Sequence, residues 1–189
     1  HAHNGDLEQA EIQARRIIDR FDLDSIDAII TNAAGCGSHL KHFTHLLRND
    51  PDYRDKAVLW DEKVRDISEW LVEVGFRKPT GDAPAQKVTY HEACHLCHGQ
   101  GISRQPREVL NAIPGLELVE LENATHCCGS AGVYNITQPE QAAKLQEEKV
   151  ACIQRTGASL VATANPGCHL QVQNGLGDSA VVKHPVSLL

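Results

Sequence analysis

The chain has 189 residues, 41% of them hydrophobic, and its 18 Lys and Arg against 25 Asp and Glu give a formal net charge of −7. This size can bury one core or two small ones, and an acidic balance without clusters of Lys or Arg argues against a nucleic-acid-binding protein. The sequence shows no apolar run near the roughly 20 residues of a membrane span and no signal-peptide pattern.

The first part of the chain is predicted to be mostly helical, with one buried strand. Apolar residues at steps of three and four predict a helix over residues 7–22. The short β-branched run at 28–31 predicts a strand, and the small residues at 34–37 then lead into a second helical stretch. Residues 51–75 have helical periodicity again, in one or two pieces. Residues 78–86, with two prolines and a glycine, are predicted to be a linker.

After the linker, predicted strands alternate with predicted helices. The strands are expected at residues 87–90, 116–121, 160–163 and 180–183, and the helices at 103–113, at 138–156 and after Gly167. This alternation predicts an α/β fold with a parallel sheet. We therefore expect tandem modules with small parallel sheets flanked by helices. The first unit is residues 1–77, the linker is 78–86 and the second unit is 87–189.

A weak internal repeat suggests that the two units are related. Residues 7–36 align without a gap to residues 139–168, and six of the thirty positions are identical. Both segments are predicted as a helix, a strand and a turn that contains Cys. At this offset the residues that match Cys127 and Cys128 would precede His1. We therefore expect a piece of a longer protein, with an incomplete first unit and a second unit truncated at its end.

Seven cysteines and eleven histidines are the distinctive chemical feature of the sequence. In an acidic chain without a signal peptide, clustered cysteines indicate metal or redox chemistry in the cytoplasm rather than disulfides. Cys94, the pair Cys127 and Cys128, and Cys168 each follow a different predicted strand of the second unit. Because parallel strands end at one edge of their sheet, we expect these side chains to converge. Convergent thiolates bind soft metal centres, either an iron-sulfur cluster or zinc.

Other interpretations of single motifs explain less. The CxxCH pattern at residues 94–98 also marks haem attachment, but haem would leave the later cysteines unexplained and could have no Met ligand in a chain without Met. A thioredoxin-like dithiol is a further possibility for the same motif. Cys152, in the middle of a predicted helix, is expected to be a small core residue. Histidines beside the cysteines could bind zinc or donate hydrogen bonds, but no single one is assigned such a role.

The cysteine pattern resembles the cysteine-rich CCG domain family. That family includes one of the subunits of heterodisulfide reductase, lactate-utilisation proteins and the iron-sulfur subunits of glycolate oxidases, and the resemblance is strongest to the last group. The motifs are HAHNGDLEQA at 1–10, TNAAGCGSHLK at 31–41, YHEACHLCHGQG at 90–101, CCGSAGVYN at 127–135 and NPGCHLQ at 165–171. The resemblance implies that the chain is the end of a first CCG module and nearly all of a second.

The resemblance also implies a set of cluster ligands. In the second unit these are Cys94, Cys127, Cys128 and Cys168, around one [4Fe-4S] cluster. In the first unit the matching residue is Cys36, as the ligand of another centre. The heterodisulfide reductase relatives end their motif with CxxC, whereas Gln171 and His39 stand at that place here. A five-cysteine cluster would therefore need Cys97, while a four-thiolate centre is complete without it.

By the same resemblance, the chain is expected to be the electron-transfer component of a glycolate (2-hydroxy acid) oxidoreductase. Electrons would come from FAD on a flavin-containing partner subunit and move on towards quinone or another membrane acceptor. We thus expect no catalytic residue here, and a place in the cytoplasm or at the inner face of the cell membrane. Two alternatives stay open: a zinc-binding structural or docking module, and a thiol-disulfide reductase component related to heterodisulfide reductase.

Overall fold

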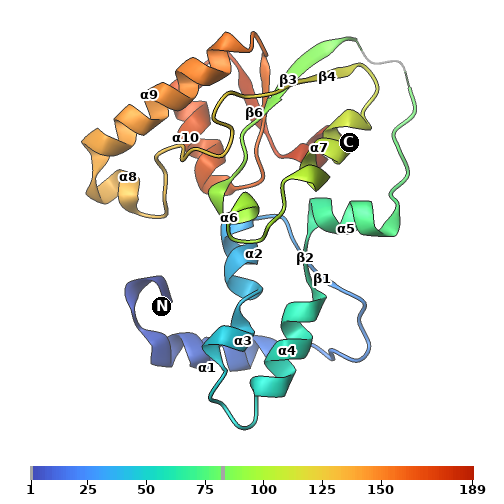
Figure 1. Cartoon of the computed structure of the whole chain (residues 1–189), viewed down its shortest axis with the longest axis vertical. Helices are drawn as coiled ribbons and strands as arrows, with labels where there is room; N and C mark the ends of the chain where they lie inside the picture. The colour runs from blue at the N-terminus through green and yellow to red at the C-terminus, as the bar shows by residue number, and fades with distance from the viewer. Residues whose placement is uncertain (1, 82–83) are drawn as a thin grey trace.

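The computed structural model of the chain describes residues 2–81 and 84–189, and it has two parallel sheets flanked by helices (Figure 1). Residues 82 and 83 of the predicted linker lie outside the described residues. The smaller sheet pairs β1 with β2, and the larger sheet has the order β4-β3-β5-β6. The strands are β1 (Ile29–Thr31), β2 (Val64–Asp66), β3 (Gln86–Tyr90), β4 (Leu116–Val119), β5 (Leu160–Ala162) and β6 (Val181–Lys183). The predicted α/β fold with small parallel sheets is confirmed.

Helices surround the smaller sheet. The first long helix starts after Asp6, whose carboxylate accepts a hydrogen bond from the Gln9 N–H at 3.3 Å. The core beneath it is centred on the stacked rings of Phe43 and Trp60, whose centroids are 5.4 Å apart. The predicted second helical stretch is divided between α2 and α3. The helices are a 3-10 turn (Ala2–Asn4), α1 (Leu7–Ile18), α2 (Ala34–Leu40), α3 (Phe43–Leu46), α4 (Arg54–Lys63) and α5 (Ile67–Val74).

Residues 51–75 differ from the sequence prediction, because β2 lies between α4 and α5. Val64 is fully buried and lies opposite Ile29 of β1. Apolar steps of three and four residues also fit the two helices on either side, so the periodicity hides a strand of only three residues. The prediction of a purely helical segment is therefore wrong at β2. This strand pairs with β1 and so forms the smaller sheet.

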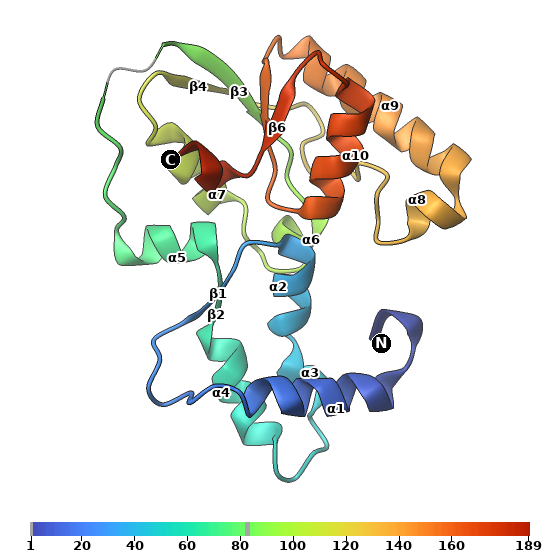
Figure 2. The ribbon, with the colours of Figure 1, turned by 180° about the vertical axis from the view of Figure 1, so that it is seen from behind.

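The larger sheet has a core on each face. Val161 and Val182 point to the face covered by α9 and α10, whereas Leu160 and Ala162 point to the face covered by α7. Figure 2 shows this arrangement from behind, with α9 and α10 on one side and α7 beside the C-terminus. The helices are α6 (Cys94–Cys97), α7 (Arg104–Asn111), α8 (Tyr134–Thr137), α9 (Pro139–Arg155), α10 (Pro166–Leu176) and a 3-10 turn (Pro185–Leu188).

The predicted repeat corresponds to two segments of similar architecture. Each segment is a helix, a strand and a helix: α1, β1 and α2 in one, and α9, β5 and α10 in the other. β1 pairs in parallel with β2, as β5 does with β6. The gapless alignment takes Ala34, the first residue of α2, to Pro166, the first residue of α10. The common origin of the segments and the boundaries of the two units stay predictions.

The start of α2 is bonded to the second unit. The Ala34 N–H donates to the Ala164 carbonyl at 3.0 Å, and Gln100 Nε2 donates to the Ala34 carbonyl at 3.0 Å. Ala34 is fully buried in the same core as Val161. Both views show α2 directly beside α6 (Figures 1 and 2). This joint fixes the residues that follow Ala34 next to the carboxyl edge of the larger sheet.

None of the helices in the described ranges combines the length with the apolar character that crossing a membrane requires.

Asp66 is a fully buried carboxylate at the start of α5. Its side chain accepts from the Ser68 N–H at 2.9 Å, and the Glu69 carboxylate accepts from the Asp66 N–H at 3.1 Å, which together form a capping box. Burial raises the pKa of Asp66, and its Oδ2 atom has no hydrogen-bond partner among the described residues. Asp66 therefore caps a helix at a cost in desolvation.

We expect Asp66→Ala to lower the free energy of unfolding by about 1 kcal/mol, because the helix cap is lost. Asp66→Asn keeps an oxygen acceptor and should lose less. Because the pKa of Asp66 is higher in the folded than in the unfolded state, protonation of its carboxyl group stabilises the fold. This stabilisation is fully present below the pKa of the unfolded state and is lost as the pH rises through the pKa of the folded state. Urea unfolding at about pH 4 and about pH 7 should show the Asn variant gaining on the wild type at the higher pH. Equal losses in both variants at both pH values would contradict this account.

Candidate metal centre

Five cysteines line one pocket at the carboxyl edge of the larger sheet. Cys94 begins α6 directly after β3, the pair Cys127 and Cys128 lies in the loop after β4, and Cys168 lies in the first turn of α10 after β5. The fifth, Cys36, comes from α2. The pocket has a volume of about 290 Å³. The structure thus brings together all four predicted ligands of the second unit.

Cys36 and Cys97 lie in places that the sequence does not indicate. The family resemblance implies a separate centre for Cys36, but the joint at Ala34 places Cys36 at the same pocket as the other four cysteines. Its side chain is exposed, whereas Cys128 and Cys168 are buried. Cys97 does not line the pocket, and its Sγ donates to the Cys94 carbonyl at 3.7 Å. A centre in this pocket therefore does not need Cys97.

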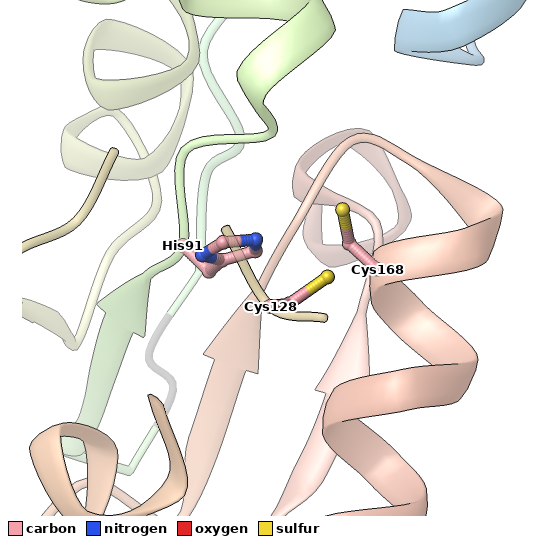
Figure 3. A group of neighbouring side chains, drawn as sticks. All are labelled: His91, Cys128 and Cys168. Atoms are coloured by element: carbon pink, nitrogen blue, oxygen red, sulfur yellow. The ribbon is translucent and has the colours of Figure 1, made fainter. Parts of the chain in front are cut away.

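His91 adds a ligand atom that the sequence reasoning leaves unassigned. One ring nitrogen of His91 and the Sγ atoms of Cys128 and Cys168 all lie within 4.8 Å of one another. Figure 3 shows these three side chains grouped together. His91 is only 1% exposed, and neither ring nitrogen makes a well-formed hydrogen bond within the described part of the chain, although the Ala124 backbone is near. A buried polar group left unpaired costs about 1–3 kcal/mol. The arrangement therefore favours a ligand that uses this nitrogen.

A signal for His91 is present in the sequence. His91 is the first residue after β3 and stands three residues before Cys94. Since parallel strands end at one edge, a side chain in this position is expected to converge with the cysteines. Burial, followed by the nearby charge of Lys149, lowers the pKa of His91 to about 3, so its ring is neutral at neutral pH. A neutral imidazole is the form that binds metals.

Three thiols of the pocket, those of Cys94, Cys127 and Cys128, resist ionisation without a cation. The contact with Cys128, together with burial, raises the pKa of Cys127, and burial raises that of Cys94. For Cys128, the hydrogen bond from Cys127 lowers the pKa, but the bond to Cys168 and burial outweigh it and raise the pKa to about 12. Cys168 accepts this bond, which lowers its pKa. A metal centre deprotonates coordinating thiols, so it would supply the charge that these groups lack.

Backbone and amide donors already point at two of the sulfurs. The Gly129 N–H donates to Cys127 Sγ at 3.3 Å, and Asn165 Nδ2 donates to Cys168 Sγ at 3.5 Å. Gly129 has a φ of +93°, and a Cβ at this position would collide with the Ala142 carbonyl. Glycine is therefore required after the Cys pair. Hydrogen bonds of this kind orient metal ligands and tune the metal that they bind.

The donor set fits a soft metal centre. Five thiols and one neutral imidazole line the pocket, and thiolate sulfur selects iron-sulfur clusters and zinc. The cysteines can hold either centre, with Cys94, Cys127, Cys128 and Cys168 as a four-thiolate set. The buried trio of His91, Cys128 and Cys168 can hold a single ion.

Comparisons with known proteins agree with the cysteine pattern. Residues 88–173 match the family model described as CCG, the cysteine-rich domain. The probable glycolate oxidase iron-sulfur subunit of Bacillus subtilis (strain 168) is 40% identical over 93% of this chain. One of the subunits of the fumarate reductase (CoM/CoB) of Methanothermobacter marburgensis is 39% identical over 86% of the chain. Lactate utilization protein A of Bacillus licheniformis is 26% identical over 93% of the chain.

The chain spans only part of these relatives. It covers 40% of the glycolate oxidase subunit, 32% of the fumarate reductase subunit and 73% of the lactate utilization protein. The matched family segment begins in β3 and ends in α10, so it contains the loops that carry Cys94, Cys127, Cys128 and Cys168. Residues 88–173 of the chain are thus similar in sequence to the CCG cysteine-rich domain.

Proposed function

We propose that the cysteine pocket binds an iron-sulfur cluster of the [4Fe-4S] type and that the chain is the electron-transfer part of a glycolate (2-hydroxy acid) oxidoreductase. The observation that carries the proposal is the convergence of Cys94, Cys127, Cys128 and Cys168 on one pocket. Four cysteine thiolates are the usual ligand set of such a cluster. When bound, it would take up and release single electrons.

The relatives support an electron-transfer role. The Bacillus subtilis relative is named as an iron-sulfur subunit, and the Methanothermobacter relative is named as part of another oxidoreductase. Both names describe redox enzymes that act on a small acid, and the cysteines gathered in this pocket are of the type that binds a metal centre. The role of the protein is then to hold the centre, limit its contact with water and orient donors towards its sulfurs.

The partners follow from this role. One component of an oxidase complex associates with others, and we propose that one of them carries FAD and oxidises the 2-hydroxy acid. Electrons would then pass through the pocket to quinone or another acceptor at the membrane. A location in the cytoplasm or at the inner face of the cell membrane fits the seven free cysteines, because thiols stay reduced there. Co-purification with a flavin subunit and cell fractionation would test these parts of the proposal.

A structural zinc site is the second candidate function. The short distances among His91, Cys128 and Cys168 favour it, since a single ion needs donors that meet at one point. Zinc would add folding stability without electron transfer.

The metal content of protein purified without oxygen separates the two candidates. We expect iron and acid-labile sulfide in about equal amounts, close to four of each per chain if the centre is of the [4Fe-4S] type. Elemental analysis, a sulfide assay and electron paramagnetic resonance of the reduced protein would measure this. Zinc without sulfide would refute the cluster and favour the structural site.

Cys128→Ser should remove the centre, because Cys128 is a buried ligand of the pocket. We expect bound iron to fall on the order of tenfold and the melting temperature to fall with it, since binding of the centre is coupled to folding. The matched control is Cys152→Ala, which changes a buried cysteine that does not line the pocket. It should lower the stability and keep the metal. Full metal content in Cys128→Ser would contradict the ligand assignment.

His91→Leu separates a cluster from a zinc ion at the level of single residues. Leucine fills a similar volume but offers no ligand atom. If four thiolates hold an iron-sulfur cluster, iron and sulfide should stay near the wild-type amounts. If His91 binds zinc, zinc affinity should fall on the order of tenfold or more, measured by competition with a chelator.

A further inference from the structure

A buried lysine stands behind the loop that carries two of the cysteines. Lys149 lies on α9, and its side chain is only 2% exposed. Its ammonium donates to the Asn123 carbonyl at 2.6 Å and to the Ala124 carbonyl at 3.5 Å. Both carbonyls belong to the loop between β4 and Cys127. The lysine therefore ties α9 to the segment that positions Cys127 and Cys128.

No carboxylate balances this charge within the described ranges. The ion pairs found there do not include Lys149, and its two hydrogen-bond acceptors are neutral carbonyls. Glu148 lines the same small cavity but is exposed. Lysine side chains usually extend to place the charge in water. A fully buried ammonium without an anion is unfavourable, and so it calls for a negative partner.

Apart from the exposed Glu148, the groups around Lys149 that can become negative are cysteine sulfurs. Cys127 and Cys152 line a cavity of about 200 Å³ together with Lys149, and Cys127 also lines the five-cysteine pocket. Burial lowers the pKa of Lys149, whereas charge on Cys152, Cys128, Cys127 or Cys168 would raise it. Negative charge on the metal-bound thiolates would therefore balance the charge of the buried ammonium.

We propose that Lys149 is the counter-charge of the cysteine pocket, a positioning residue that favours the more negative, reduced state of the centre and strengthens metal binding. The redox part of this inference rests on the proposed function. A fixed positive charge in a site of low polarity stabilises added negative charge more than bulk water would. Its removal should make reduction harder and should weaken the binding of any thiolate-bound cation.

Two substitutions separate the charge from the hydrogen bonds. Lys149→Gln removes the charge and keeps an amide donor for the loop carbonyls, whereas Lys149→Met removes both. Lys144→Gln is the matched control, because Lys144 is exposed on the same helix. All three chains keep the cysteines and His91. Melting temperatures should differ between Lys149→Gln and Lys149→Met, because only the first keeps a donor. The effect of the lost charge on the midpoint potential and on metal affinity should be similar in the two variants.

The first measurement is the midpoint potential of the loaded protein, obtained by redox titration of its spectra. We expect both Lys149 variants to be reduced with an equilibrium constant about tenfold smaller, a shift of about 59 mV to lower potential for a one-electron couple. Lys144→Gln should match the wild type. Wild-type potentials in both Lys149 variants would overturn the proposal, and so would a shift that appears only in Lys149→Met, since that would reflect the lost hydrogen bonds.

The second measurement uses metal-free protein and Co²⁺, whose absorption reports thiolate binding. We expect Co²⁺ to bind about tenfold more weakly to both Lys149 variants than to Lys144→Gln and to the wild type. This measurement does not require an iron-sulfur cluster. If the wild type contains no cluster but the Co²⁺ difference holds, the proposed electron transfer fails and the counter-charge stands. Equal Co²⁺ affinities in all four proteins would overturn the counter-charge.

Discussion

Parallel pairing on both sides of β3 is the constraint on which the rest of the structure depends. β3 lies between β4 and β5, with Thr89 opposite both Val119 and Val161. Three strands therefore end side by side, and the chain must turn there into α6, into the loop after β4 and into α10. A cysteine in each turn can therefore reach a common space. The sheet in this way gathers ligands from distant parts of the sequence.

The small residues of the first unit have a packing role at the same edge. A Cβ at Gly37 would lie 2.8 Å from Gln100 Nε2, and the Gly35 N–H donates to Asn165 Oδ1 at 3.1 Å. A side chain at Gly37 would force its neighbours apart, whereas a Cβ at Gly35 would lie 3.4 Å from Asn165 Oδ1, an ordinary contact. Gly37 therefore allows the close approach of the two units, and this approach brings Cys36 to the pocket.

Much of the second unit could be predicted from its sequence, because its strands alternate with the helices α7, α9 and α10, whereas α6 and α8, of four residues each, were not predicted. The convergence of Cys94 with the later cysteines needed only the parallel order of the strands. β2 could not be predicted in this way, since three residues carry no period of their own. The place of Cys36 also could not be predicted, because it depends on a joint between units. His91 could have been predicted, because it directly follows a strand of the same sheet as the cysteines do.

Charge balance links the pocket to its surroundings. Burial disfavours the thiolate of Cys94 and the protonated forms of His91 and Lys149. Without a centre, burial therefore works against charge in this region, and the polar atoms of His91 are left unpaired among the residues that the structure describes. A bound cation reverses the preference of the thiols, and their negative charge then compensates the lysine behind them. Part of the binding energy of the centre is consequently spent on ionising its ligands, and a fixed positive charge nearby reduces that cost in every oxidation state.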